Sequence, residues 1–169
     1  ESHFLFGGID YRMHSRLMLH LMAGFENRQF ESDIRDDDNS PYVDVSATYN
    51  LSPQTMLSGG YRLAMSETQL ATFLKSEKHG IYGTLTQEFS DKLLLSLGAS
   101  YNLDDLDAAD SAVAQQDGDE KFIRLTARLA YRITEIVSAE AGYIYNDLSS
   151  DFQRSYDRNR VYLGVRLDY

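Results

Sequence analysis

The sequence predicts an all-β, transmembrane, antiparallel up-and-down β-barrel, and three observations lead to this prediction. Apolar and polar residues alternate with a period of two over nine stretches of about ten residues, as in strands with one apolar face. Short turns and long polar connections follow one another, as in a meander of hairpins. The polar side of the stretches is rich in Gly, Ser, Thr, Asn and Arg, whereas soluble sheets protect exposed strands with Lys and Glu.

The first four stretches alternate with different clarity. Residues 4–13 are the weakest, because Phe4 and Phe6 fall in the polar register. The next three stretches alternate cleanly and comprise residues 17–26, 43–50 and 57–65.

Five further stretches complete the predicted sheet. In residues 81–89 the apolar side is diluted by Gly83 and Gln87. The other four stretches alternate cleanly and comprise residues 93–102, 123–133, 137–146 and 160–169. We expect short turns at residues 14–16, 52–54, 90–92 and 133–135. We expect long polar loops at residues 31–40, 66–78, 104–120 and 149–157.

The composition excludes several classes of protein. The 169 residues contain no Cys, which removes disulfides, thiol catalysis and cysteine-based zinc sites. The net charge of −10 disfavours binding to nucleic acid, which requires a basic surface. The sequence contains no run of 18 apolar residues, so it predicts no transmembrane helix. The mean hydropathy of −0.41 would suit a soluble protein, but the order of the residues points elsewhere.

The apolar side of the strands is expected to face lipid, with the polar side enclosing water. In the strand centres the apolar register holds no Asp, Glu, Lys or Arg, and a charge facing lipid costs about 2–4 kcal/mol at the bilayer midplane. Aromatic residues gather towards both ends of the strands, as in interfacial girdles. The alternative is a soluble nine-stranded barrel or sandwich. It is disfavoured because about 40 apolar side chains exceed what a small barrel can hold.

Eight charged residues are expected to line the lumen: Arg12, Arg62, Arg124, Arg128, Arg132, Glu140, Arg166 and Asp168. Glu140 is expected to pair with Arg128 across the turn near Thr134. Two interpretations of the set stay open. One is a ladder of structural ion pairs between strands, and the other is a basic stripe that attracts anions, as Arg rings do in pores.

Enzymatic and metal chemistry are not expected. None of His3, His14, His20 and His79 has a Ser two residues away on the same strand face, so no nucleophile and base are brought together. Acidic runs at residues 31–38 and 104–120 suggest calcium, but they lack the glycine and spacing of a calcium loop. We interpret them as solvated loops that bridge to lipopolysaccharide through divalent cations, with no resident metal or cofactor.

Residues 162–169 resemble the C-terminal signal of Gram-negative outer-membrane β-barrels, with Tyr162, Gly164, Leu167 and Tyr169 at the positions of that signal. Residues 155–160 resemble the end of β-barrel porins associated with polysaccharide export. These resemblances imply location in the bacterial outer membrane. They also imply that the partners are the lipid bilayer with its lipopolysaccharide, the barrel-assembly machinery and other export-system subunits.

Residues 1–169 are expected to form a single barrel domain. Bacterial barrels have an even number of strands, so nine strands suggest the C-terminal portion of a longer barrel. The rival is an eight-stranded barrel in which residues 4–13 form no barrel strand. The function expected is a porin-like channel for a hydrophilic solute or polymer, such as an exported polysaccharide. The alternative is a small closed barrel that acts through its loops or partner proteins.

Overall fold

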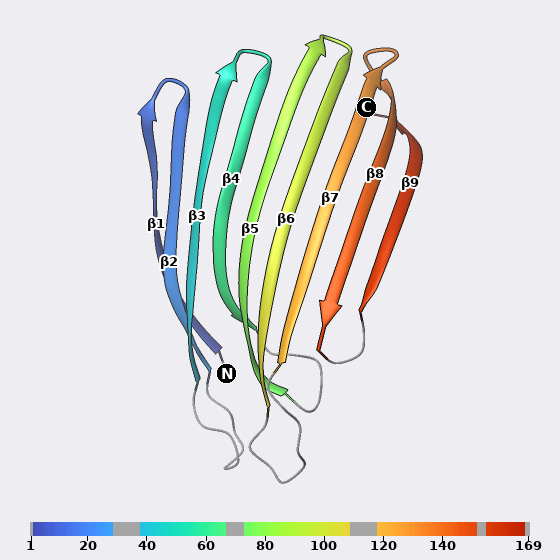
Figure 1. Ribbon diagram of the computed structural model, residues 1–169. Coiled ribbons are helices and arrows are strands. Elements are labelled where there is room, and N and C mark those ends of the chain that lie inside the picture. The colour runs from blue at the N-terminus through green and yellow to red at the C-terminus, as the bar shows by residue number, and fades with distance from the viewer. Residues whose placement is uncertain (1, 29–37, 67–72, 109–117, 152–154, 168–169) are drawn as a thin grey trace.

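The computed structural model describes residues 2–28, 38–66, 73–108, 118–151 and 155–167, and within them it forms one antiparallel sheet. Figure 1 shows the nine strands, whose bounds are β1 Ser2–His14, β2 Leu17–Arg28, β3 Asp38–Ser52, β4 Thr55–Ser66, β5 Phe73–Ser90, β6 Leu93–Ala108, β7 Gly118–Arg132, β8 Val137–Ser150 and β9 Tyr156–Leu167. The described residues contain no helix long and apolar enough to cross a membrane.

Each strand pairs with the next one in the chain, so the sheet is an up-and-down meander. This confirms the all-β class and the nine antiparallel strands, including the weakly patterned strand at the N-terminus. The sheet is not closed: among the described residues, β1 pairs only with β2 and β9 pairs only with β8.

Short turns connect the strands in pairs at one end of the sheet, at the top of Figure 1. The turn between β7 and β8 is held by side chain and backbone together. The Val137 amide donates to Thr134 Oγ1 at 3.0 Å, and the Ile133 amide donates to the Val137 carbonyl at 2.9 Å. In the β3–β4 turn the Gln54 amide donates to Ser52 Oγ at 3.2 Å. These local bonds fix the register of the hairpins.

The strands extend further towards the long connections than the sequence predicts. The strand ladder occupies parts of residues 66–78 and 104–120, which we expected to be loop. Backbone pairing needs no apolar side chain, so it continues past the apolar segment. One polar cross-strand contact in this part joins Lys78 Nζ to Asp104 Oδ2 at 3.3 Å.

The two faces of the sheet differ as the alternation predicts. Large apolar side chains project openly from one face, here called the apolar face: Ile9 is 66 % exposed and Leu163 is 83 % exposed. The opposite face, here called the polar face, is the more sheltered, and Asp44 on it is 5 % exposed. A sheet that exposes its apolar face and shelters its polar one is inverted relative to a soluble protein.

The apolar face forms a band of nearly constant height. The apolar register runs from Leu93 to Tyr101 on β6, from Tyr131 back to Ile123 on β7 and from Val137 to Tyr145 on β8, nine residues each. Nine residues rise about 30 Å along a strand, and a barrel tilt of about 40° reduces this to a height of roughly 23 Å. That height matches the apolar band of about 25 Å in membrane barrels.

Aromatic residues border the band on both sides. Exposed aromatic side chains at the short-turn end are Tyr11, Tyr49, Phe89 and Tyr131, and those towards the long connections are Phe25, Tyr101 and Tyr143. These two rows match the girdles that the sequence predicts.

Gly142 on β8 leaves room for the ring of Tyr162 on β9. An added Cβ at Gly142 would collide with that ring, whereas an added Cβ at Gly7 would meet no atom within 4 Å. We expect Gly142→Ala to cost about 1–3 kcal/mol, because overpacking displaces the ring, and Gly7→Ala to leave stability unchanged or slightly raised. Urea unfolding in lipid vesicles measures both. Tyr162→Ala should cost less in the Gly142→Ala background than alone, and equal costs would contradict the contact.

Candidate lumen-lining face

The polar face gathers the described residues of the predicted lumen set. Arg12 lies on β1, Arg62 on β4, and Arg166 on β9. The pairing register puts these side chains on the polar face together with the following residues of β7 and β8: Arg124, Arg128, Arg132 and Glu140. Asp168 and Tyr169 lie outside the described residues. Whether these side chains line a pore stays a prediction.

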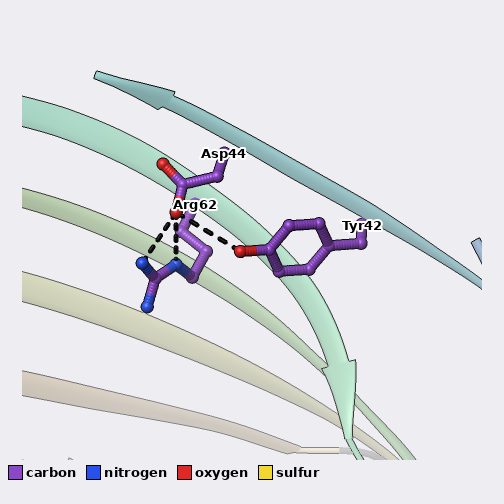
Figure 2. Close-up of polar contacts among 3 residues, drawn as sticks. All are labelled: Tyr42, Asp44 and Arg62. Atoms are coloured by element: carbon purple, nitrogen blue, oxygen red, sulfur yellow. Dashed lines mark hydrogen bonds and ion pairs between the residues drawn. The ribbon is translucent and has the colours of Figure 1, made fainter. Parts of the chain in front are cut away.

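Asp44 and Arg62 form the most sheltered ion pair on the polar face, shown in Figure 2. Arg62 donates to Asp44 Oδ2 from Nε at 2.8 Å and approaches it with a terminal nitrogen at 2.7 Å. The Tyr42 hydroxyl donates to the same oxygen at 3.3 Å. The Asp44 side chain is 6 % exposed and that of Arg62 is 55 % exposed. The carboxylate thus depends on Arg62, while the guanidinium also reaches solvent.

Arg128 and Glu140 form the ion pair that the hairpin between β7 and β8 predicts. Two guanidinium nitrogens of Arg128 donate to Glu140 Oε2, at 2.9 and 2.6 Å. Four residues before Arg128, on the same face of β7, Arg124 Nε donates to the neutral amide oxygen of Asn146 at 3.0 Å. The guanidinium of Arg124 also lies 5.3 Å from the centre of the Phe122 ring, within the range of a cation–π contact.

Asp10 and His20 form a third contact on the polar face, between β1 and β2. His20 Nδ1 lies 2.6 Å from Asp10 Oδ1. The alternation of residues 17–26 puts His20 on the polar side of its strand, but the sequence reasoning did not pair it with Asp10. The signal was available, because both residues are five positions from Ser15, the centre of the turn expected at residues 14–16.

Arg158 is a further polar-face residue that the sequence reasoning missed, because it falls between the loop expected at residues 149–157 and the strand expected at residues 160–169. It pairs in register with Asn146 of β8, and its guanidinium lies 5.4 Å from the centre of the Tyr156 ring. Its position follows from where β9 begins, which the sequence pattern did not define.

The assembly-signal residues divide between the two faces of β9. Tyr162 and Gly164 lie on the polar face, where Tyr162 covers Gly142 and Gly164 lies beside Glu140. Leu167 lies on the apolar face and is 65 % exposed.

The apolar face carries a small network of polar side chains near the end of the apolar band that is closer to the long connections. The Tyr61 hydroxyl lies 2.7 Å from His79 Nδ1, and His79 Nε2 lies 3.9 Å from Asp105 Oδ2. These groups lie where the apolar register ends on β4, β5 and β6, which suits side chains at a membrane–water interface.

Two hollows open on the polar face. The larger, of about 510 Å³, lies at the short-turn end, and its lining includes Arg128, Arg132, Arg166 and Glu88. The smaller, of about 160 Å³, is lined by Tyr82, Gly98 and Arg124, among others. In the part of the chain that the structure describes, no group of three His, Asp or Glu residues is placed to hold a metal ion. The acidic residues 31–37 lie outside the described residues.

Comparison with known proteins adds a family. Residues 65–169 match the family model described as "Putative beta-barrel porin 2", a wider span than the residues that carry the resemblance in the sequence. Comparisons with curated proteins and with solved structures give no match. The match covers more than half of the chain and agrees with the two-faced antiparallel sheet. The chain therefore belongs to this β-barrel porin family, whose barrels are membrane-embedded.

Proposed function

We propose that this chain forms the wall of a bacterial outer-membrane channel that passes a hydrophilic solute or polymer, with polysaccharide export as the specific case. One observation carries the proposal: an apolar band of membrane height on one face of the sheet and a sheltered, water-compatible lining on the other. Family membership supports the porin-like role. In this proposal the chain has no catalytic activity of its own.

The polar face also offers surfaces that suit sugars. Tyr42, Tyr82 and Tyr162 are half-buried on this face, and an aromatic ring with a hydroxyl combines an apolar surface with a hydrogen-bonding group. Together with the resemblance of residues 155–160, these rings support a carbohydrate as the polymer.

The proposed barrel is completed by strands beyond the nine described, and its partners are lipopolysaccharide, the assembly machinery and other export subunits. The exposed edges of β1 and β9 support the further strands, because a membrane sheet must have its edges paired. The signal residues on β9 support recognition by the assembly machinery. The intact mass of the mature protein tests the first point: a mass equal to the 19.2 kDa of these residues would contradict further strands in the same polypeptide.

The channel is tested by planar-bilayer recordings on the full-length natural protein, folded as judged by a heat-modifiable shift on a gel. We expect discrete conductance steps. A folded protein that gives no steps would contradict the channel, and it would favour a small closed barrel that acts through its loops or partners.

Cysteine labelling tests whether the polar face meets water. The chain has no native Cys, so Ala99→Cys and Ser100→Cys each introduce one thiol, at adjacent positions on opposite faces of β6. In lipid vesicles, we expect a water-soluble maleimide to label the thiol at position 100 much faster than the thiol at position 99, because only the former meets water. The reverse order would contradict the assigned orientation of the sheet.

A further inference from the structure

The polar face of β7, β8 and β9 carries an excess of positive charge. Six arginines belong to it: Arg124, Arg128, Arg132, Arg158, Arg160 and Arg166. Among the described positions of this face there are two acids, Glu120 near the long connections and Glu140. The excess of positive charge is local, because the whole chain has a net charge of −10. We call this surface the basic wall.

The arginines of the basic wall form two rows separated by one strand. The register aligns Arg132, Ser138 and Arg166 across β7, β8 and β9, and it aligns Arg124, Asn146 and Arg158 in the same way. Strands two apart are about 10 Å from each other, and residues four apart on β7 are about 13 Å from each other. Between the rows, β8 presents small or neutral residues next to Glu140. The two rows therefore flank β8, and the ring of Tyr162 lies between them over Gly142.

Most of this positive charge is available to a ligand. Arg128 is paired with Glu140, and Arg124 bonds to a neutral amide. Arg158 contacts the ring of Tyr156. In the part of the chain that the structure describes, four arginines contact no carboxylate: Arg124, Arg132, Arg158 and Arg160. All four are exposed, and guanidinium groups bind carboxylates, sulfates and phosphates through paired N–H donors.

The polar face of β1 to β4 does not carry such a concentration of arginine. Among the side chains that the structure describes on β1 to β4, the polar face carries Asp44 paired with Arg62 and Asp10 in contact with His20. Arg12 adds one positive charge to this side. A neutral solute would gain nothing from a concentration of arginine at one wall.

We infer that the basic wall binds the anionic groups of the molecule that the channel passes, so that this molecule is an acidic solute or polymer carrying carboxylate, sulfate or phosphate. The inference rests on the proposed channel function and adds the chemical class of the substrate. The hollow of about 510 Å³ at the short-turn end is of mixed charge, because Glu88, Asp91 and Glu135 line it together with Lys92, Arg128, Arg132 and Arg166. The inference therefore rests on the exposed arginines of the basic wall and not on this hollow.

Binding is tested on the full-length protein in detergent, with calorimetry as the readout. The probes are an acidic oligogalacturonate, a neutral maltooligosaccharide of equal length and inorganic phosphate. We expect the acidic oligomer to bind and the neutral one not to bind, and we expect added salt to weaken binding. Binding of the oligomer but not of phosphate would assign the site to a polymer, and comparable binding of both would assign it to small anions.

The variant combines Arg132→Gln, Arg158→Gln and Arg160→Gln, and it should weaken binding about tenfold, since three exposed charge contacts are lost. The matched control removes three positive charges elsewhere, by Arg16→Gln, Lys78→Gln and Lys121→Gln, and should bind like the natural protein. If the triple variant does not fold, Arg160→Gln alone replaces it. Equal binding of the variant and the natural protein, or salt-independent binding, would overturn the inference.

Planar-bilayer recordings under a salt gradient separate this inference from the proposed function. The natural channel should prefer anions, and the triple variant should shift the reversal potential towards cation preference. A conducting, cation-selective channel that binds no acidic oligomer would overturn the role inferred for the basic wall and would leave the proposed channel function intact. A protein that binds the oligomer without conducting would overturn the channel and retain the basic wall.

Discussion

Replacing Arg62 by Met should destabilise the protein by about 3 kcal/mol, because it leaves a buried carboxylate without its cation. Asp44 is 5 % exposed, and three donor groups converge on a single one of its oxygens. After the substitution, the long contact from the Tyr42 hydroxyl is all that remains of these three. Urea unfolding of the protein folded in lipid vesicles gives the change in free energy.

The reciprocal substitution should cost much less. Asp44→Asn removes the charge from the buried position and leaves Arg62, whose side chain is 55 % exposed to solvent. We expect a loss of about 1 kcal/mol, the usual net value of a hydrogen bond. The double variant Asp44→Asn, Arg62→Met should be more stable than Arg62→Met alone, because it contains no buried charge. If Asp44→Asn were the more costly change, the assigned burial of the carboxylate would be wrong.

Placing an arginine at the middle of the apolar band should cost about 2–4 kcal/mol. Leu85 lies on the apolar face of β5, midway between Ile81 and Phe89, and pairs in register with Leu57 and Leu97. Its neighbour Thr84 faces the other way, next to Gly98 and the smaller hollow. Leu85→Arg should therefore be strongly destabilising, and Thr84→Arg should cost less than about 1 kcal/mol because its guanidinium reaches water.

Tryptophan fluorescence separates lipid from a protein core as the surroundings of Leu85. The chain has no Trp, so Leu85→Trp and Thr84→Trp each give a single emitter. Lipids with brominated acyl chains should quench the fluorescence at position 85 and have little effect at position 84. Equal quenching at the two positions, or equal costs of the two arginine variants, would contradict contact of the apolar face with lipid.

The pairing of charges within hairpins was accessible from the sequence. Arg128 and Glu140 are equally distant from the turn at Thr134, and the expected ion pair is present. Asp44 with Arg62 and Asp10 with His20 are direct partners in the register, whereas the Arg128–Glu140 contact is diagonal, because Arg128 pairs with Gly142 and Glu140 with Ala130. A tight turn fixes the register of both strands, so the alternation and the turn positions together determine which side chains face each other.

The pairing across the long connections was not accessible. Nothing in residues 149–157 fixes where β9 starts, so Arg158 was left outside the expected strand although it aligns with Asn146. For the same reason the starts of β5 and β7 were placed too late and the end of β6 was placed too early. Polar strands beyond the apolar band carry no alternation to read, because neither of their faces is selected to be apolar.

The free edges of β1 and β9 bear on how such a sheet enters a membrane. β1 and β9 run in the same direction, so joining them directly would create a parallel pair, whereas an odd number of added strands would keep every pair antiparallel. Each amide left open to hydrocarbon costs several kcal/mol, and each edge is at least twelve residues long. An open sheet of this kind is therefore unstable inside the bilayer unless the hydrogen bonds of both edges are satisfied, either by closure of the barrel or by a partner that pairs with the edges.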